Sequence, residues 1–450
     1  MKDILSEYYR TPFTSRVVRP PAVSKEGTGF FRFGPDIVCY GECSSGVADD
    51  VLNSAALDVS DALSITNAEL CLPFDIGNVV ENLRRERYSR VLNGVPQALS
   101  HRAWIRECYY FVREILPVYF RRHLQRAYFK DWKTLGFPHW PVDSTVDALH
   151  EALLRMTMIA QGCDSVPFIW FWPDGASACL IMTHDVEAVA GRDFTGTLMD
   201  IDLSYGFKAS FQVVPEKRYE VTDSYVSEIR SRGFEFNIHD LNHGGRLFDE
   251  KTKFLQHAKQ INEYVKKYGA RGFRAGAMYR NQDWFDAFEF SYDMSVPNVA
   301  HLEPQRGGCC TVMPYYVGKI LELPLTTSQD YSIFHILNDY TIDLWKEQIS
   351  LVQQKSGLLS FIAHPDYLIN SRCRRVYESL LDYLRRVVDR DTIWATLPGE
   401  VDRWWRARSE MKLVPEGGGW RIEGPDKDRA RIAYATIERD RIVYRIGGAP

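Results

Sequence analysis

Long apolar runs are missing from this sequence: no window reaches about 18 consecutive uncharged apolar residues, the length that a membrane-spanning helix requires. The first residues, MKDILSEYYRTPFTSR, also lack the basic and then apolar pattern of a signal peptide. Neither charge is in large excess, since 55 Lys and Arg residues face 59 Asp and Glu residues. This balance argues against nucleic acid or an anionic membrane surface as a partner. We therefore expect a soluble, cytoplasmic protein.

Paired cysteine motifs are missing too. The nine cysteines form no zinc-finger spacing and no disulfide framework, so we expect reduced thiols in the core. Cys39 and Cys43 could hold a metal ion, but no second cysteine pair with suitable spacing completes such a site.

The chain length of 450 residues predicts two or three domains, and the residue pattern changes at two places. Residues 1–140 are first irregular and then helical in their spacing. They include the basic amphipathic stretch 102–129, which we expect to pack on the main domain by its aromatic residues. Residues 141–408 form the predicted main domain. Residues 409–450 contain four short strand-like runs separated by Gly, Pro and Asp, which predict a small antiparallel β module.

From about residue 177, short apolar runs alternate with amphipathic helical stretches. The runs are ACLIMT, FKASFQVV, FEFNI, GFR, FEFSYDMSV, ILELP and LLSFIA. Apolar strands that alternate with helices are typical of a parallel sheet, and about seven units predict an α/β fold with a closed or nearly closed β/α barrel. In such a barrel the functional groups lie where the strands end.

The first apolar run ends in LIMTHDVE, where Asp185 and Glu187 are separated by one valine. If this segment stays extended, both carboxylates point to one side of the strand and His184 points to the other, because strand side chains alternate. Two carboxylates can therefore share one site.

The third run is followed by a second candidate motif, in which His239 and His243 lie four residues apart. This spacing places both imidazoles on one face of a helical turn, and alone it is common in surface or capping histidines. Beside a carboxylate strand, two imidazoles and one carboxylate form a ligand set for zinc or a similar divalent ion, with a position left open for water.

Two further runs end in basic side chains. Arg274 ends the run GFR, where it could hold a loop by a salt bridge or keep a neighbouring carboxylate base ionised. His364 follows LLSFIA and precedes a proline. It is either a core histidine or, opposite a metal site, a general acid.

Taken in order, these motifs resemble those of the polysaccharide deacetylase family, the NodB-homology carbohydrate esterases of family 4. Residues 183–187 look like T-F-D-D in its T-x-D-x-D form, and 235–243 are similar to the family's E-I-G strand with N-H-T-x-x-H. Residues 271–276 resemble the segment around R-x-P, and 362–364 look like L-x-H. The resemblance covers about residues 177–400 and implies an irregular (β/α)7 barrel.

The resemblance also implies a role for each group. Glu187, His239 and His243 would bind the metal ion, Asp185 would be the general base, Arg274 would tether that base, and His364 would be the general acid. From the residues alone, Asp185 and Glu187 could exchange roles.

Four features depart from the family pattern. Glu187 stands in place of an aspartate, Asp240 replaces a Thr or Ser, and Ala275-Gly276 follow the arginine where the family has its proline. The family's Asp-Trp element, which supports the acid, has no clear counterpart, and Asp293 is the candidate for it.

One glycine-rich segment between the motifs needs its own interpretation. A Gly pair beside Cys309 and Cys310 predicts a close approach of the backbone, and Glu322 and Asp330 flank a strand that ends in Leu-Pro. The segment is either a packed loop with a barrel strand or part of a substrate-contacting surface.

The leading hypothesis is a metal-dependent hydrolase, with zinc as the expected ion. It would remove an N-acyl group from an amino sugar of a polysaccharide or its precursor, and acetyl is the leading candidate for the acyl group. One alternative is an inactive protein of the same fold that binds glycan or scaffolds polysaccharide assembly. Another is an amide hydrolase with a metal ion and a substrate other than a sugar.

Overall fold

The computed structural model describes residues 3–18, 28–44, 52, 56–89, 129 and 131–447. The basic stretch 102–129 therefore lies outside the described residues, except for Phe129. Within the described ranges, every helix is too short or too polar to cross a bilayer.

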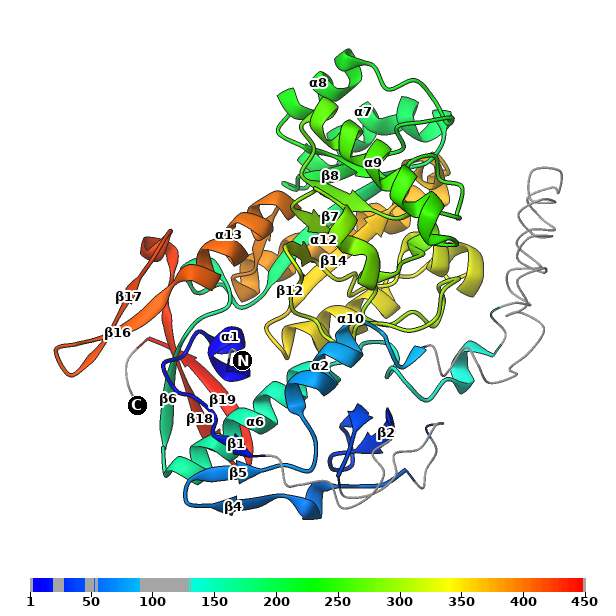
Figure 1. The fold of residues 1–450 in the computed structure, drawn as a ribbon. Coiled ribbons are helices and arrows are strands. Elements are labelled where there is room, and N and C mark those ends of the chain that lie inside the picture. The colour runs from blue at the N-terminus through cyan, green and yellow to red at the C-terminus, as the bar shows by residue number, and fades with distance from the viewer. Residues whose placement is uncertain are drawn as a thin grey trace.

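A curled, mostly parallel sheet forms the centre of the molecule (Figure 1). Its strands are β7 (Cys179–Val186), β8 (Ala209–Val213), β9 (Glu235–His239), β10 (Gly272–Arg274), β11 (Tyr292–Asp293), β12 (Tyr315–Val317), β13 (Ile320–Glu322), β14 (Leu358–Ala363) and β15 (Trp394–Thr396). They follow the order β12-β13-β11-β10-β9-β8-β7-β14, with β15 beside the start of β7. Each of the seven predicted apolar runs overlaps one of these strands. Almost all their side chains are buried, which explains the near-continuous apolar sequence.

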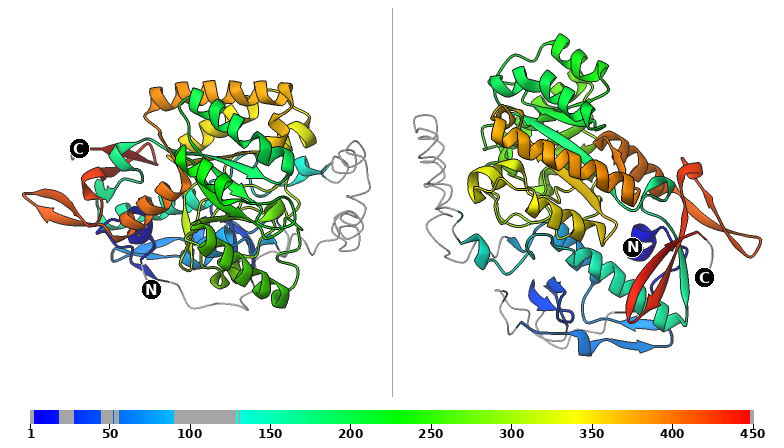
Figure 2. Two further views of the ribbon diagram at one scale, coloured as in Figure 1. Left: turned by 90° about the horizontal axis from the view of Figure 1, so that it is seen from above. Right: turned by 180° about the vertical axis from the view of Figure 1, so that it is seen from behind.

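Helices surround the outer face of the curled sheet (Figure 2). They are α7 (Val189–Ser204), α8 (Asp223–Ser231), α9 (Lys251–Tyr268), α10 (Asp343–Gln353), α11 (Pro365–Leu368), α12 (Ser371–Asp391) and α13 (Pro398–Glu410). In α12 the buried apolar residues Val376, Leu380, Leu384 and Val387 recur every three or four positions, so one face packs on the sheet. The predicted α/β alternation is thus present from β7 to β10.

The sheet is a curled half-barrel, so the predicted irregular (β/α)7 barrel, closed or nearly closed, is not confirmed in that detail. Between β10 and β11 the chain forms only the 3-10 turns η5 (Gly276–Met278) and η6 (Gln282–Ala287), and the antiparallel strand β12 precedes β13. At the open edge, Thr326 Oγ1 donates a hydrogen bond of 2.6 Å to Leu358 O and Thr327 Oγ1 donates one of 2.7 Å to Ser360 O. Threonine hydroxyls therefore link the segment after β13 to β14 where the strand ladder is interrupted.

The described part of the N-terminal region mixes short strands with helices. It contains α1 (Ile4–Tyr9), β1 (Val17–Val18), β2 (Thr28–Arg32), β3 (Val38–Glu42), β4 (Ser64–Thr66), β5 (Glu69–Cys71) and α2 (Ile76–Arg84). Aromatic and β-branched residues favour extended structure in β2 and β3, although the sequence predicted an irregular segment there. The helix α6 (Thr145–Gln161) follows and leads into the sheet domain.

The C-terminal strands β16 (Lys412–Glu416), β17 (Gly419–Glu423), β18 (Ile432–Glu438) and β19 (Arg441–Ile446) are antiparallel, as predicted. However, β18 also pairs with β6 (Ser165–Ile169), a strand that precedes the central sheet. Tyr9 Oη and Tyr444 Oη lie 2.8 Å apart, so α1 and β19 are in contact beside this small sheet (Figure 1).

Candidate active site

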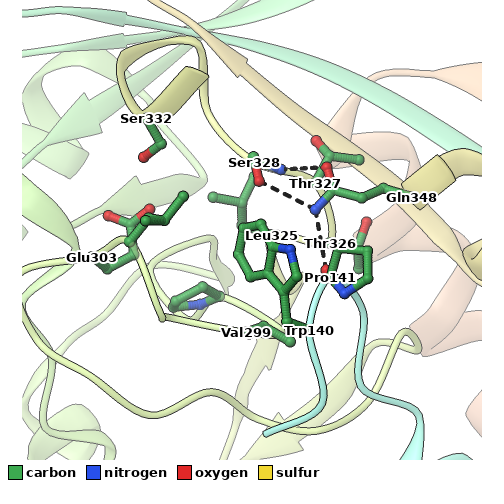
Figure 3. A pocket seen from close by; sticks show the side chains of 12 residues that line it. Trp140, Pro141, Val299, Glu303, Leu325, Thr326, Thr327, Ser328, Ser332 and Gln348 are labelled. Atoms are coloured by element: carbon green, nitrogen blue, oxygen red, sulfur yellow. Dashed lines mark hydrogen bonds between the residues drawn. The ribbon is translucent and has the colours of Figure 1, made fainter. Parts of the chain in front are cut away.

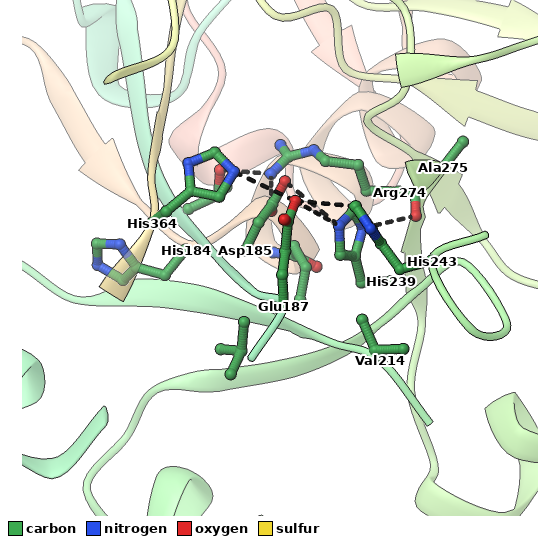
Figure 4. A network of polar contacts seen from close by, with 12 residues as sticks. His184, Asp185, Glu187, Val214, His239, His243, Arg274, Ala275 and His364 are labelled. Atoms are coloured by element: carbon green, nitrogen blue, oxygen red, sulfur yellow. Dashed lines mark hydrogen bonds and ion pairs between the residues drawn. The ribbon is translucent and has the colours of Figure 1, made fainter. Parts of the chain in front are cut away.

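The carboxyl ends of β7, β9, β10 and β14 bring the predicted site residues into one network (Figure 4). Parallel strands end at the same edge of a sheet, so residues from distant parts of the sequence converge there. The network contains Asp185, Glu187, His239, His243, Arg274 and His364.

Glu187 and the two histidines of the second motif form a compact group. Glu187 Oε1 lies 2.9 Å from His243 Nε2 and 3.6 Å from His239 Nε2. One candidate ligand atom from each of the three residues lies within 4.8 Å of the others. Asp185 is farther away, with Oδ2 at 3.9 Å from His239 Nε2.

The donor atoms of this group suit a divalent metal ion. His239 Nε2 and both ring nitrogens of His243 are buried and have no hydrogen-bond partner among the described residues. His243 Nε2 is close to Glu187 without hydrogen-bond geometry. Buried polar atoms are normally satisfied, so nitrogens that converge on one carboxylate in this way fit a ligand set for a shared ion. Two imidazoles and a carboxylate are a donor set that zinc commonly takes.

A backbone carbonyl orients the first of these histidines. His239 Nδ1 lies 3.1 Å from Arg274 O, and a carbonyl can only accept, so Nδ1 carries the hydrogen. This tautomer leaves Nε2 with its lone pair directed toward Glu187. A fixed tautomer is what a metal-binding histidine requires from its surroundings.

Asp185 is held by the buried arginine of the third motif. Arg274 Nη1 donates to Asp185 Oδ1 at 2.6 Å and to Thr183 Oγ1 at 2.9 Å, and its Nε donates to Met294 O at 3.0 Å. Burial by itself would raise the pKa of Asp185, but the guanidinium and the nearby imidazoles outweigh burial and lower it. Asp185 is therefore ionised at neutral pH, with Oδ2 left for another partner.

The partner of His364 is Asp330, and the expectation that Asp293 fills this place is wrong. Asp330 Oδ1 lies 2.6 Å from His364 Nδ1, and its Oδ2 accepts a hydrogen bond of 2.7 Å from the His364 backbone N–H. Asp293 instead accepts hydrogen bonds from Ser295, at 2.9 Å from the backbone N–H and 2.8 Å from Oγ. The sequence had marked Asp330 beside a strand end, but gave no signal that it pairs with His364.

The electrostatics of His364 follow from this contact. Burial by itself would lower the pKa of His364, but Asp330 and then Glu187 outweigh it and hold the pKa well above its ordinary value. His364 Nε2 lies 3.4 Å from Glu187 Oε1, so its proton points into the site. For Glu187 the imidazoles of His243, His239 and His364 overcome the opposing effect of burial and lower its pKa well below the usual range.

Two of the departures from the family pattern are coupled in space. A Cβ atom added to Gly276 would lie 2.5 Å from Asp240 Oδ2 and 3.0 Å from the His243 ring. Asp240 and His243 both have positive φ angles, of 55° and 54°. A larger residue at position 276 would therefore require the Asp240 side chain or the His243 ring to move.

The segment around the adjacent cysteines is a packed loop. Cys309 and Cys310 are fully buried, and a Cβ on Gly308 would lie 2.2 Å from Asn298 O. Glu86 Oε1 accepts a hydrogen bond of 2.6 Å from Gly308 N, so the N-terminal region fixes this loop. The predicted close approach of the backbone is confirmed.

A small cavity lies beside the loop that carries Asp330 (Figure 3). Its volume is about 10 Å³, which is the room that one water molecule requires. Trp140, Glu303 and Ser332 are among its lining residues, and Gln329 Nε2 donates to Glu303 Oε2 at 2.7 Å. The six predicted site residues do not line it, so this cavity is separate from their network.

No protein-family model matches this chain, and no curated protein matches it. Solved structures do, and polysaccharide deacetylases are among them. A protein from Mycobacterium smegmatis assigned as a polysaccharide deacetylase is 16% identical over 55% of this chain and 96% of its own, with a TM-score of 0.42. One from Pseudomonas aeruginosa PAO1 with the same assignment is 12% identical over 52% and 93%, also with a TM-score of 0.42. The allantoinase Puue is 10% identical over 52% and 92%, with a TM-score of 0.41. Identities this low carry no information about substrate or mechanism.

Proposed function

We propose that this protein is a metal-dependent hydrolase that removes an N-acyl group from an amino sugar of a polysaccharide or its precursor, with acetyl as the leading candidate for the acyl group. The observation that carries the proposal is the convergence of a candidate metal triad, an arginine-held carboxylate and a histidine–aspartate pair on one edge of the sheet. Amide hydrolysis needs an activated water, a base and an acid for the leaving nitrogen.

In this proposal Glu187, His239 and His243 hold the ion, for which zinc suits the donors. Bound there, a divalent ion supplies Lewis acidity that acidifies water and polarises a carbonyl. Asp185 accepts a proton from the attacking water through Oδ2, because Arg274 occupies its Oδ1. His364 donates its Nε2 proton to the leaving amine, and Asp330 holds the ring with Nδ1 away from the substrate.

The choice of an amino sugar as the proposed substrate is based on the sequence motifs, which resemble those of carbohydrate deacetylases. The acyl group must fit beside the carboxylates and the imidazole of His364, since these groups supply both proton transfers.

The test combines metal analysis with an activity assay. Purified protein should contain stoichiometric metal and release acetate from N-acetylated glucosamine oligomers, and H239A should lose both. D185N should keep the metal but lose about 10²- to 10⁴-fold in kcat, the usual contribution of a general base. H257A removes a histidine of α9 that lies outside the network and serves as the matched control.

The proposal is wrong if metal-loaded protein releases no acetate from any N-acetylated sugar while H239A keeps the wild-type metal content. E187Q separates the two carboxylates. It should lower the metal content, whereas a loss of metal in D185N with normal metal in E187Q would reverse their roles.

A further inference from the structure

His184 lies on the opposite face of β7 from the catalytic carboxylates, as the alternation of the strand predicts (Figure 4). Its side chain and that of Asp202, on α7, have no solvent exposure. His184 Nε2 lies 2.8 Å from Asp202 Oδ2, and Tyr377 Oη of α12 donates to Asp202 Oδ1 at 2.7 Å. Three polar side chains from β7, α7 and α12 thus form one buried set behind the site.

The second nitrogen of His184 reaches the neighbouring strand. Nδ1 lies 3.1 Å from Ala363 O at the end of β14, and it must be the donor because a carbonyl can only accept. Ala363 directly precedes His364. The buried imidazole therefore holds the carbonyl of the peptide group that joins Ala363 to His364.

The other end of the same peptide group is also held. The His364 N–H donates to Asp330 Oδ2 at 2.7 Å, and the other oxygen of Asp330 contacts the His364 ring. One hydrogen-bonded chain therefore runs from Tyr377 through Asp202, His184 and the peptide to Asp330 and the imidazole of His364. Its two outer elements, α7 and α12, lie outside the sheet, and its inner end faces Glu187.

We infer that His184 is a positioning residue, which fixes the Ala363–His364 peptide against β7 and so sets the imidazole of His364 relative to Asp185. Because β7 carries Asp185 next to His184, one residue pair couples the two strands that would supply the base and the acid. The inference rests on the proposed function for the role of His364, but the geometry that it concerns does not depend on the substrate.

Packing alone does not require this arrangement. Replacing a buried charged or polar set by apolar residues of similar volume is often neutral or stabilising, because desolvation opposes the electrostatic gain. A fully buried His, Asp and Tyr set therefore points to a need for direction, which hydrogen bonds supply and apolar contacts do not.

Two amide substitutions separate positioning from packing. In H184N the side-chain nitrogen reaches the place of Nδ1 and can still donate to Ala363 O. In H184Q it reaches the place of Nε2 and can contact only Asp202. We expect H184N to keep kcat within about threefold of wild type and H184Q to lose at least tenfold, with KM and metal content unchanged in both.

Stability should follow the opposite order, because Gln is the larger residue and keeps the contact with Asp202. Urea unfolding measures this, and amide hydrogen exchange of the segment 358–368 in the metal-free protein reports the geometry without any activity. Exchange at His364 should be at least tenfold faster in H184Q than in H184N. The isosteric D202N leaves the bond to Ala363 in place and should keep kcat within about threefold.

The inference is overturned if kcat follows stability, so that H184Q is at least as active as H184N. Equal amide exchange rates at His364 in the two variants would also overturn it. If neither variant at position 184 folds, D202N decides, since a loss of kcat above tenfold there contradicts the role assigned to the Ala363 contact. If wild-type protein releases no acetate, the proposed function fails, and the exchange comparison alone supports or overturns the positioning role.

Discussion

Two histidine–aspartate pairs lie on opposite sides of one peptide group, and they differ in what the second ring nitrogen meets. In the sealed pair, His184 and Asp202, the second nitrogen contacts a backbone carbonyl and neither side chain is exposed. In the open pair, His364 and Asp330, the second nitrogen lies 3.4 Å from Glu187 and faces the site. The same two residue types therefore form a fully enclosed contact in one place and, in the proposed mechanism, a proton donor in the other.

The difference teaches that the reactivity of such a pair depends on access to the distal nitrogen. A histidine with both nitrogens bonded to protein groups has no proton to give to a substrate. One that is held through Nδ1 alone presents Nε2 in a fixed direction, which is the arrangement that acid catalysis requires.

The largest effect on stability is expected in the sealed pair. D202L removes the buried partner of His184 Nε2 and of the Tyr377 hydroxyl, and it should lower the free energy of unfolding by about 3–5 kcal/mol. Urea unfolding measures it. The double variant H184F/D202L replaces both members of the pair by apolar groups and should recover part of this loss. If its loss of stability equals the sum of the losses in H184F and D202L, the two residues do not contribute as a pair.

The open pair should respond in activity instead. D330N keeps the size of the side chain but cannot accept both hydrogen bonds from His364, so kcat should fall about 10²- to 10³-fold with metal content unchanged. Acetate release and metal analysis give the two readouts. D343N, an exposed aspartate at the start of α10, is the matched control and should be neutral. Equal kcat values in D330N and D343N would remove the distinction between the two pairs.

A third buried acid near the open pair sharpens the comparison through pH. Burial raises the pKa of Glu303 from 4.5 to about 7, although Gln329, Arg280 and His364 oppose it. The folded protein then binds this proton more tightly than the unfolded chain, so stability falls as pH rises from about 4.5 to about 7. The amide at position 303 in E303Q does not titrate in this range. The free energy of unfolding of E303Q should therefore fall by about 2–3 kcal/mol less than that of the wild type between about pH 4.5 and 7. Unfolding curves at several pH values measure this, and parallel pH dependences of the two proteins would refute it.

Local regularity made much of this site predictable. The alternation of side chains along LIMTHDVE placed Asp185 and Glu187 on one face and His184 on the other, and the structure has this arrangement. The apolar runs predicted the positions of seven parallel strands, because buried strands need apolar residues on both faces. The ends of those runs gave His239, His243, Arg274 and His364.

Other features could not be inferred from neighbours in the sequence. Asp330 pairs with His364 because the segment after β13 folds beside β14, which brings together residues 34 positions apart. Asp293 was a natural candidate on β11, but its carboxyl group is used by Ser295. The strand ladder does not continue from β13 to β14, and threonine hydroxyls of the segment after β13 bond to β14 instead.

The sequence by itself determined which residue types end each strand and which face of β7 each side chain occupies, since both depend on backbone geometry over a few residues. Tertiary structure alone decided the partners: Asp330 for His364, Asp202 for His184, and the glycine at 276 for the loop of Asp240 and His243. Those contacts depend on the order of strands and the packing of helices, which bring distant segments together and follow no local period. For that reason the same letters, His and Asp, became a sealed pair behind β7 and an open pair in front of it.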